Sequence, residues 1–145
     1  MAKVVVFEKN RAGFVLMRVA CEPFLEEIEL IHILHENALF RYIEQTDIRD
    51  IALFIIALRS PVCYSREVIR KLRSTKELIP IPIIIFSPTA YLRDAIVCKD
   101  LGANGYLLRS QNLEKFQKTV RFMILTWVDI DLDSNRYQSL TSSDS

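Results

Sequence analysis

Five short apolar runs along this 145-residue chain constrain its fold more than any other feature. The first of them, residues 4–7, is unbroken, and the run over residues 51–58 is the most apolar segment of the chain. An unbroken run is typical of a strand buried on both faces of a parallel sheet, since a sheet with one solvated face shows alternation instead. The predicted strands cover residues 4–7, 30–34, 51–58, 83–86 and 106–108.

The segments between these runs have the pattern of amphipathic helices, with apolar residues three and four positions apart. Asn10 and Ser65 are suited to cap the first and third helices, Pro23 ends the first, and Gly102 suits the left-handed position after the fourth. The other helices are predicted over residues 37–44, 65–74, 91–101 and 113–127.

The apolar positions of the first and third helices can be named from the sequence. In the first, the apolar positions at helical spacing are Phe14, Val15, Met17, Val19 and Ala20. In the third, Val68, Ile69 and Leu72 are expected to face the core, and the basic residues Arg66, Arg70, Lys71 and Arg73 to face solvent.

Strands that alternate with helices predict a three-layer α/β domain, because parallel strands need crossover helices that cover both faces of the sheet. A flavodoxin-like (βα)5 arrangement with strand order 2-1-3-4-5 is expected. In such sheets ligands bind at the carboxyl ends of the strands, near the switch point between strands one and three. Function is therefore expected at Glu8, Lys9, residues 57–61, Ser87 and Arg109.

Composition and charge exclude several classes of protein. The length suits one domain, predicted over residues 1–128 and followed by an acidic, Ser-rich tail over 129–145 that we expect to be disordered. A net charge of +1 indicates neither nucleic acid nor an anionic membrane as partner. Because the three cysteines (Cys21, Cys63, Cys98) form no Cys-x-x-Cys pair and the first apolar run is too short to span a membrane, we expect a cytoplasmic protein.

Several local motifs resemble the CheY-like receiver domain of two-component response regulators over residues 3–128. The segment ALFIIALRSPVCYSREVIRKLR resembles its third strand, loop and third helix, with Pro61 at the loop proline and Glu67 six residues later. IPIIIFSPTA resembles the fourth strand, which ends in a small hydroxyl residue, here Ser87, and LGANGYLLRS places Tyr106 at the aromatic switch position. The ending LEKFQKTVRFMILTWV is similar to the last helix of the Rcp-type receivers linked to bacterial phytochromes.

The phosphorylation site of the family is degenerate in this sequence. Receivers hold two acidic residues after the first strand, which with a phosphoacceptor aspartate ligate Mg²⁺, whereas this chain has Glu8 and Lys9 there. Ala57 stands where the resemblance places the aspartate, and Arg109 stands where it places the conserved lysine. Only Ser87 matches the family without change.

Electrostatics indicates that this degenerate site binds no Mg²⁺, and we expect no cofactor. An ammonium about 5 Å from the ion would repel it by roughly 7 kcal/mol at an effective dielectric constant near 20. Instead, we expect Glu8 to form an ion pair with Lys9 or Arg109.

The sequence therefore predicts a stand-alone signalling protein that acts by phosphorylation-independent binding, not an enzyme. Its partner would be a histidine kinase, another signalling protein or a second copy, bound through the fourth helix, fifth strand and fifth helix. Tyr91 and Trp127 are candidate anchors, and Tyr106 is expected either to pack or to contact the partner. Two alternatives remain: a phosphorelay receiver with a non-standard acceptor such as Glu8, and a small α/β enzyme. The enzyme is disfavoured because no Gly-rich loop follows the first strand.

Other polar clusters receive structural interpretations. His32 and His35, three apart on a predicted strand, should face opposite sides and share no metal. The acidic run at Asp129, Asp131 and Asp133 lacks the glycine and glutamate of a calcium loop. The basic face of the third helix should be solvated rather than bound to nucleic acid, and Cys63 should be an ordinary thiol.

Overall fold

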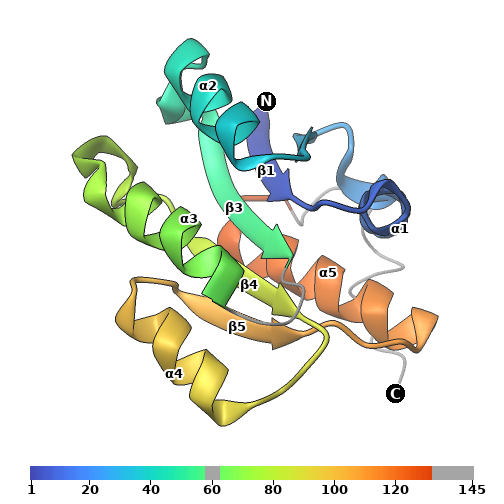
Figure 1. Cartoon of the computed structure of the whole chain (residues 1–145). Coiled ribbons are helices and arrows are strands. Elements are labelled where there is room, and N and C mark those ends of the chain that lie inside the picture. The colour runs from blue at the N-terminus through green and yellow to red at the C-terminus, as the bar shows by residue number, and fades with distance from the viewer. Residues whose placement is uncertain (58–62, 132–145) are drawn as a thin grey trace.

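A computed structural model gives the structure, which describes residues 1–57 and 63–131, with the backbone alone at 63 and 64 (Figure 1). Ten main elements alternate along the chain: β1 (Ala2–Phe7), α1 (Arg11–Ala20), β2 (Ile28–Ile33), α2 (Glu36–Gln45), β3 (Ile51–Ala57), α3 (Cys63–Ser74), β4 (Ile83–Ser87), α4 (Leu92–Asp100), β5 (Gly105–Leu108) and α5 (Leu113–Trp127). Short 3-10 helices precede β2, β3 and β4, at Glu22–Phe24, Ile48–Asp50 and Lys76–Leu78.

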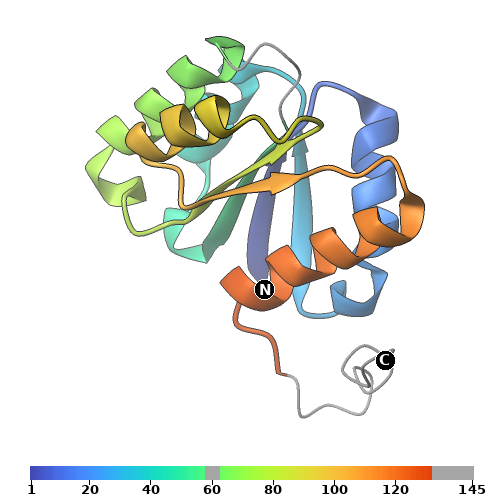
Figure 2. The same cartoon turned by 90° about the horizontal axis from the view of Figure 1, so that it is seen from below.

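The five strands form one parallel sheet in the order β2-β1-β3-β4-β5, which confirms the predicted flavodoxin-like topology. Helices α1 and α5 cover one face of this sheet, and α2, α3 and α4 cover the other (Figures 1 and 2). The observed strands differ from the predicted ones by a few residues at their ends. β2, for example, begins at Ile28, two residues earlier than expected.

The unbroken apolar runs are explained by two separate cores, one on each face of the sheet. In β1, Val4 and Val6 point into the core under α1 and α5, whereas Val5 and Phe7 point into the core under α2, α3 and α4. All five residues of β4 are buried for the same reason. Apolar burial of this kind contributes about 25 cal/mol per Å² and is the main stabilising term of the domain.

In α1, the apolar positions that recur at helical spacing differ in burial. Met17 and Ala20 are buried against the sheet and Phe14 packs beside them, but Val15, Val19 and the neighbouring Leu16 are exposed. Six of the seven residues from 14 to 20 are apolar, and together they cover more of the helix circumference than the sheet can bury. The remainder forms an apolar ridge on the surface.

In α3, two expectations were wrong. The helix begins at Cys63, so Ser65 lies within its first turn, buried, instead of capping it. Val68, Ile69 and Leu72 are buried as predicted. Arg73, expected in solvent, is half-buried beneath the turn between α4 and β5.

The Arg73 guanidinium ties together segments that are distant in sequence. It donates hydrogen bonds to the backbone carbonyl oxygens of Gly102 (2.8 Å) and Ile81 (2.8 Å), to those of Leu78 and Ile79, and to Oδ1 of Asn104 (2.7 Å). Gly102 has the predicted positive φ (110°), and a β-carbon there would overlap the Arg73 side chain. The position therefore needs glycine for two reasons.

Packing continues beyond α5 and past the predicted domain boundary. Val128 and Ile130 are buried in the core under α1 and α5, and the amide of Asp131 donates to Oε1 of Glu27 (3.2 Å). The ordered domain therefore extends at least to residue 131, three residues further than expected. The rest of the predicted tail, including Asp133, lies outside the described residues. Within the described parts of the chain, no helix is long and apolar enough to cross a membrane.

Candidate functional site

The carboxyl-terminal edge of the sheet brings together the side chains that the sequence singled out. Glu8 follows β1, Ala57 ends β3, Ser87 ends β4 and Arg109 follows β5. Glu8, Ala57 and Ser87 are buried, whereas Lys9 is exposed. The remaining loop positions predicted here, 58–61, lie outside the described residues.

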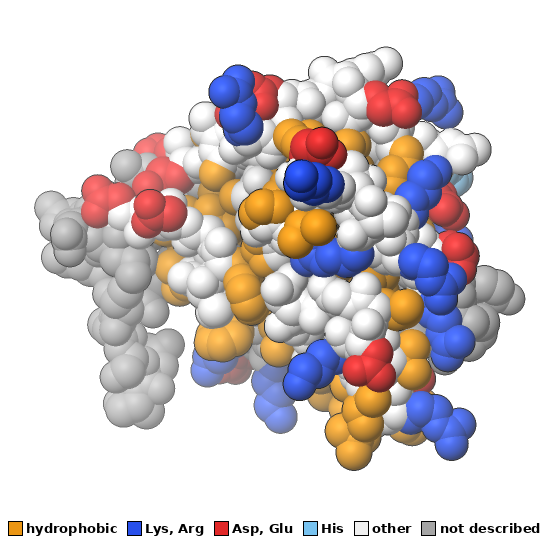
Figure 3. All heavy atoms as spheres, turned by 90° about the vertical axis from the view of Figure 1, so that its left-hand side faces the viewer, with side chains coloured by type: hydrophobic (Ala, Val, Ile, Leu, Met, Phe, Trp, Pro, Cys, Tyr) orange, Lys and Arg blue, Asp and Glu red, His pale blue; other side chains and the backbone are white. Residues whose placement is uncertain are grey.

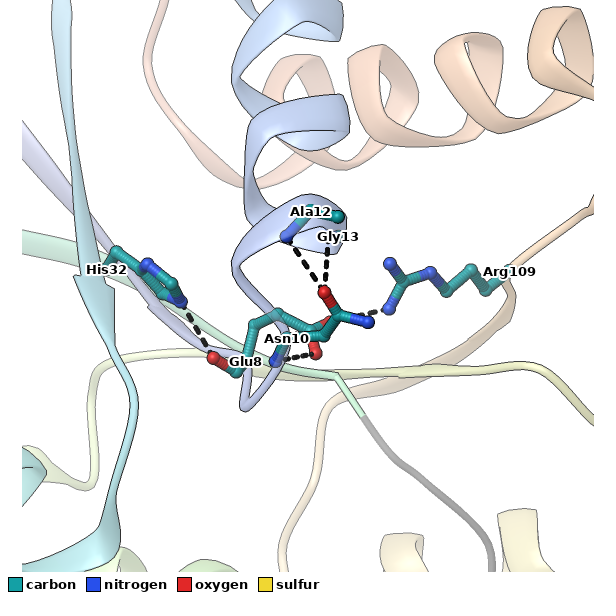
Figure 4. Close-up of polar contacts among 6 residues, drawn as sticks. All are labelled: Glu8, Asn10, Ala12, Gly13, His32 and Arg109. Carbon is teal, nitrogen blue, oxygen red and sulfur yellow. Dashed lines mark hydrogen bonds and ion pairs between the residues drawn. The ribbon is translucent and has the colours of Figure 1, made fainter.

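A buried ion pair joins Glu8 to Arg109 (Figure 4). Nη1 of Arg109 donates to Oε2 of Glu8 at 2.6 Å, and the side chains are 20% and 2% exposed, respectively. From the sequence, either Lys9 or Arg109 was expected to pair with Glu8, and in the structure the partner is Arg109. Because β3 and β4 lie between β1 and β5 in the sheet, this pair spans the ends of two intervening strands.

Backbone groups hold Glu8 in place around this pair. Its Oε1 accepts from the amide of Asn10 (2.9 Å), and its carbonyl oxygen lies 2.7 Å from Nε2 of His32. The His32 ring stacks on Phe14 of α1, with 4.2 Å between ring centroids. His32 belongs to β2, whereas His35 follows that strand and precedes α2. The expectation that both histidines belong to the strand was therefore wrong for His35.

Arg109 is positioned by aromatic rings and by its own backbone. Its guanidinium carbon lies 5.7 Å from the ring centroids of both Phe86 and Phe116, which is within the range of cation–π attraction. Its amide donates to the carbonyl of Ser87 at 2.6 Å. The guanidinium thus lies between an apolar floor and the Glu8 carboxylate.

Gly13 provides the space that this arrangement needs. Asn10 caps α1, its Oδ1 accepting from the amides of Ala12 (2.8 Å) and Gly13 (3.4 Å), and this cap turns the helix over the ion pair (Figure 4). A β-carbon at Gly13 would overlap Nη2 of Arg109 and lie 3.1 Å from the Glu8 carboxyl group. Sequence reasoning missed Gly13 and His32, because their roles depend on contacts that local periodicity does not encode.

A second set of hydrogen bonds connects β5 to the loop after β4. The hydroxyl of Tyr106 donates to the carbonyl of Thr89 (3.0 Å), and the Thr89 amide donates to Oγ of Ser87 (3.2 Å). Tyr106 is half-buried, so its ring packs while its hydroxyl is satisfied within the domain. The loop is therefore held in one position by groups of the chain itself.

No family model and no curated protein matches this sequence. Solved structures do match, and they share one fold. The response regulator RPA3017 of R. palustris red light signalling superposes with a TM-score of 0.76 at 18% identity, covering 89% of this chain and 95% of that one. The phosphorylated cyanobacterial phytochrome response regulator RcpA gives 0.76 at 23% identity, covering 88% and 94%, and the Mn²⁺-bound response regulator Rcp1 gives 0.73 at 22%, covering 90% and 97%. The chain has the receiver fold.

In this receiver fold, the polar groups present do not suit a divalent metal ion. Among the residues that the structure describes, no group of three or more His, Cys, Asp or Glu side chains is close enough to hold one. At the strand ends Glu8 supplies a single carboxylate, which already binds Arg109, so the pair carries no net charge. Mg²⁺ prefers several oxygen ligands, whereas the described residues at these strand ends supply one carboxylate, that of Glu8.

The candidate partner contacts of the receiver fold differ in exposure. Tyr91, which precedes α4, is 64% exposed, whereas Trp127 is half-buried and packs against the core under α1 and α5. Tyr91 is therefore the better candidate anchor.

Burial raises the pKa of Cys21 to about 12 and that of Cys98 to about 11, so both thiols stay protonated at neutral pH. The side chain of Cys63 lies outside the described residues.

Proposed function

We propose that the chain is a signalling protein of the receiver type that acts by binding a protein partner and is not phosphorylated at the end of β3. The observation that supports this most directly is the buried Glu8–Arg109 pair. It joins the two strand ends that would otherwise face a metal ion and a phosphoryl group, and Ala57 ends β3, one of the two strands between them.

The chemistry of acyl phosphate formation supports the proposal. An aspartyl phosphate requires a carboxylate as nucleophile, and the methyl group of Ala57 cannot provide one. Glu8 is the alternative acceptor, but both of its carboxylate oxygens are engaged, by Arg109 and by the Asn10 amide. Phosphorylation of Glu8 would have to break a buried ion pair, so the phosphorelay alternative is disfavoured.

The surface formed by α4, β5 and α5 is the proposed docking site. It presents large exposed apolar side chains, which often dominate binding energy when a partner buries them. These are Tyr91, Leu92, Ile96, Leu108 and Phe122. A standard interface buries about 800 Å² per partner, which these elements could provide. A histidine kinase or another signalling protein would bind there, and a second copy of the chain is the alternative occupant.

The charge distribution supports a protein partner rather than nucleic acid. Figure 3 shows a flank of the molecule on which acidic and basic side chains are scattered among apolar ones. Of the predicted basic face of α3, Arg73 is used inside the domain and Arg70 pairs with Glu67. The remaining charge is too small and too dispersed to track a phosphate backbone.

A cytoplasmic location is also proposed, supported by the cysteines. Cys21 and Cys98 are free and buried in different cores, on opposite faces of the sheet, so they cannot form a disulfide with each other.

An enzymatic role is disfavoured, because the residues after β1, Glu8 to Arg11, include no glycine for a phosphate-binding loop.

The proposal is tested by an NMR titration of the isotope-labelled full chain with Mg²⁺ and then beryllofluoride, a mimic of the acyl phosphate. We expect the resonances of Ala57, Ser87, Tyr106 and Arg109 to stay unchanged. Saturable shifts at low millimolar Mg²⁺ would show that a working phosphorylation site exists, and the proposal would be wrong.

The docking surface is tested by capture of histidine kinases on the immobilised chain and by sedimentation of the chain alone. Ile96→Asp should abolish either kind of association, whereas Val15→Asp, an equally exposed position on α1, should retain it. Loss of binding in both variants, or in neither, would contradict docking through α4.

A further inference from the structure

A groove beside the ion pair has the composition of a small-ligand site. It has a volume of about 460 Å³ and lies between α1, the loop after β4 and the start of α5. Leu16, Pro88, Leu113 and Phe116 give it apolar walls, and Arg109 and Ser110 give it one polar side. Small-molecule pockets typically enclose about 300 to 1,000 Å³ and combine apolar walls with a few polar groups.

Arg109 brings unused hydrogen-bonding capacity to this groove. A guanidinium has five N–H donors, and within the described residues Nη1 alone has a partner, the Glu8 carboxylate. The Arg109 side chain is 20% exposed, so part of it remains in contact with solvent. The ion pair therefore fixes the cation without exhausting its donors.

The apolar walls are likewise available. Leu16 of α1 and Leu113 of α5 are exposed large aliphatic side chains that both line the groove. Phe116, by contrast, is buried and lies under the guanidinium. A flat or branched apolar group placed between the two leucines would remove both from water, which is favourable by about 25 cal/mol per Å².

We propose that this groove binds a small amphiphilic carboxylate, with an apolar body between Leu16 and Leu113 and its carboxylate on Arg109. Because Glu8 already balances the charge of Arg109, the remaining guanidinium donors, rather than net charge, identify the ligand class. The free guanidinium donors suit a carboxylate, and charge-assisted hydrogen bonds of this kind are roughly twice as strong as neutral ones. None of the five apolar residues assigned to the docking surface lines this groove, so the inference does not depend on the proposed function.

The test uses naphthoate as probe in an NMR titration of the isotope-labelled full chain, with the neutral naphthamide and with acetate as comparisons. Naphthoate should shift the amide resonances of Leu16, Ser110 and Leu113 in a saturable way. Naphthamide should bind roughly tenfold more weakly, since it lacks the charge. Acetate should not saturate, since it lacks the apolar body. Equal binding of naphthoate and naphthamide, or shifts away from the groove, would overturn the proposal.

Three variants distinguish binding in the groove from nonspecific binding. Leu16→Glu places a negative charge on the groove wall without touching the ion pair and should abolish naphthoate binding. Ile79→Glu, at an exposed isoleucine that belongs neither to the groove nor to the docking surface, should bind naphthoate like the parent. Arg109→Lys keeps a cation beside Glu8 but loses the planar fork, and should weaken binding roughly tenfold while the chain stays folded, as its unfolding midpoint will show. Parent-like binding by Leu16→Glu or Arg109→Lys would overturn the proposal.

Discussion

Removing one partner of the Glu8–Arg109 pair should destabilise the domain more than removing both. Glu8→Gln preserves the shape of the side chain and an oxygen for the Asn10 amide, but it leaves the Arg109 charge without its counter-ion. Arg109→Met keeps the apolar contacts to the phenylalanine rings and leaves the Glu8 carboxylate unpaired. The double variant contains neither charge.

The exposed fractions of the two side chains decide which substitution should lower the free energy of unfolding more. Breaking a buried ion pair by removing one partner costs about 3–5 kcal/mol. Because Arg109 is 20% exposed and keeps partial hydration, Glu8→Gln should lower the free energy of unfolding by about 2–3 kcal/mol. The Glu8 side chain is only 2% exposed, so Arg109→Met should cost about 3–5 kcal/mol. In the double variant no charge is stranded, and the loss should return to about 1 kcal/mol.

Urea unfolding measures these values, with the fluorescence of the single tryptophan, Trp127, as the probe. Trp127 packs against the core that also contains Phe86 and Phe116, so its signal reports on the same half of the domain. The denaturant slope should stay constant across the variants, which would show that the unfolded state is unchanged. Losses below about 0.5 kcal/mol in both single variants, or an additive loss in the double variant, would refute the reasoning.

Three further measurements test other features. Gly13→Ala should lower the free energy of unfolding by about 1–3 kcal/mol despite the higher helix propensity of alanine, because the added methyl group displaces the ion pair. In an Arg109→Met background the same change should become neutral or stabilising. Arg73→Lys should cost about 2–4 kcal/mol in urea unfolding, since one ammonium cannot replace a guanidinium that reaches five acceptors, whereas Arg70→Ala on the exposed face should cost less than about 0.5 kcal/mol. The raised pKa values of Cys21 and Cys98 mean that the folded thiols keep their protons while unfolded thiols lose theirs, so stability should fall as the pH rises from 9.0 toward 11. Replacing both cysteines with alanine should flatten that part of the pH profile.

The fold could be predicted from the sequence because its strands are buried on both faces. A run such as residues 51–58 has few alternatives to a central strand, and the spacing between runs leaves room for one crossover helix each. Helix faces were harder to predict. Val15 and Val19 are apolar and helical, yet they point away from the sheet, because periodicity indicates an apolar stripe without showing how much of it a neighbour covers.

The candidate site was predictable as a set of positions but not as a set of contacts. Glu8, Ala57 and Arg109 follow from where predicted strands end, and the resemblance to receivers pointed to the same positions. The choice of Arg109 over Lys9 as partner required the direction in which each side chain leaves its strand. Arg73 was misassigned because its acceptors lie up to 31 residues away, beyond any helical period.

The length of chain between Glu8 and Arg109 has a consequence for folding kinetics. The two residues are 101 positions apart, and Arg109 follows β5, a strand at the edge of the sheet that pairs with β4 alone. Their contact can form only after the intervening strands and crossovers are in place. Closing so long a loop earlier would cost chain entropy that no strand pairing or packing yet offsets. The ion pair should therefore be absent from the folding transition state, and its energy should act mainly as a barrier to unfolding. The Glu8–Arg109 pair would then determine how long a folded molecule persists more than how quickly it forms.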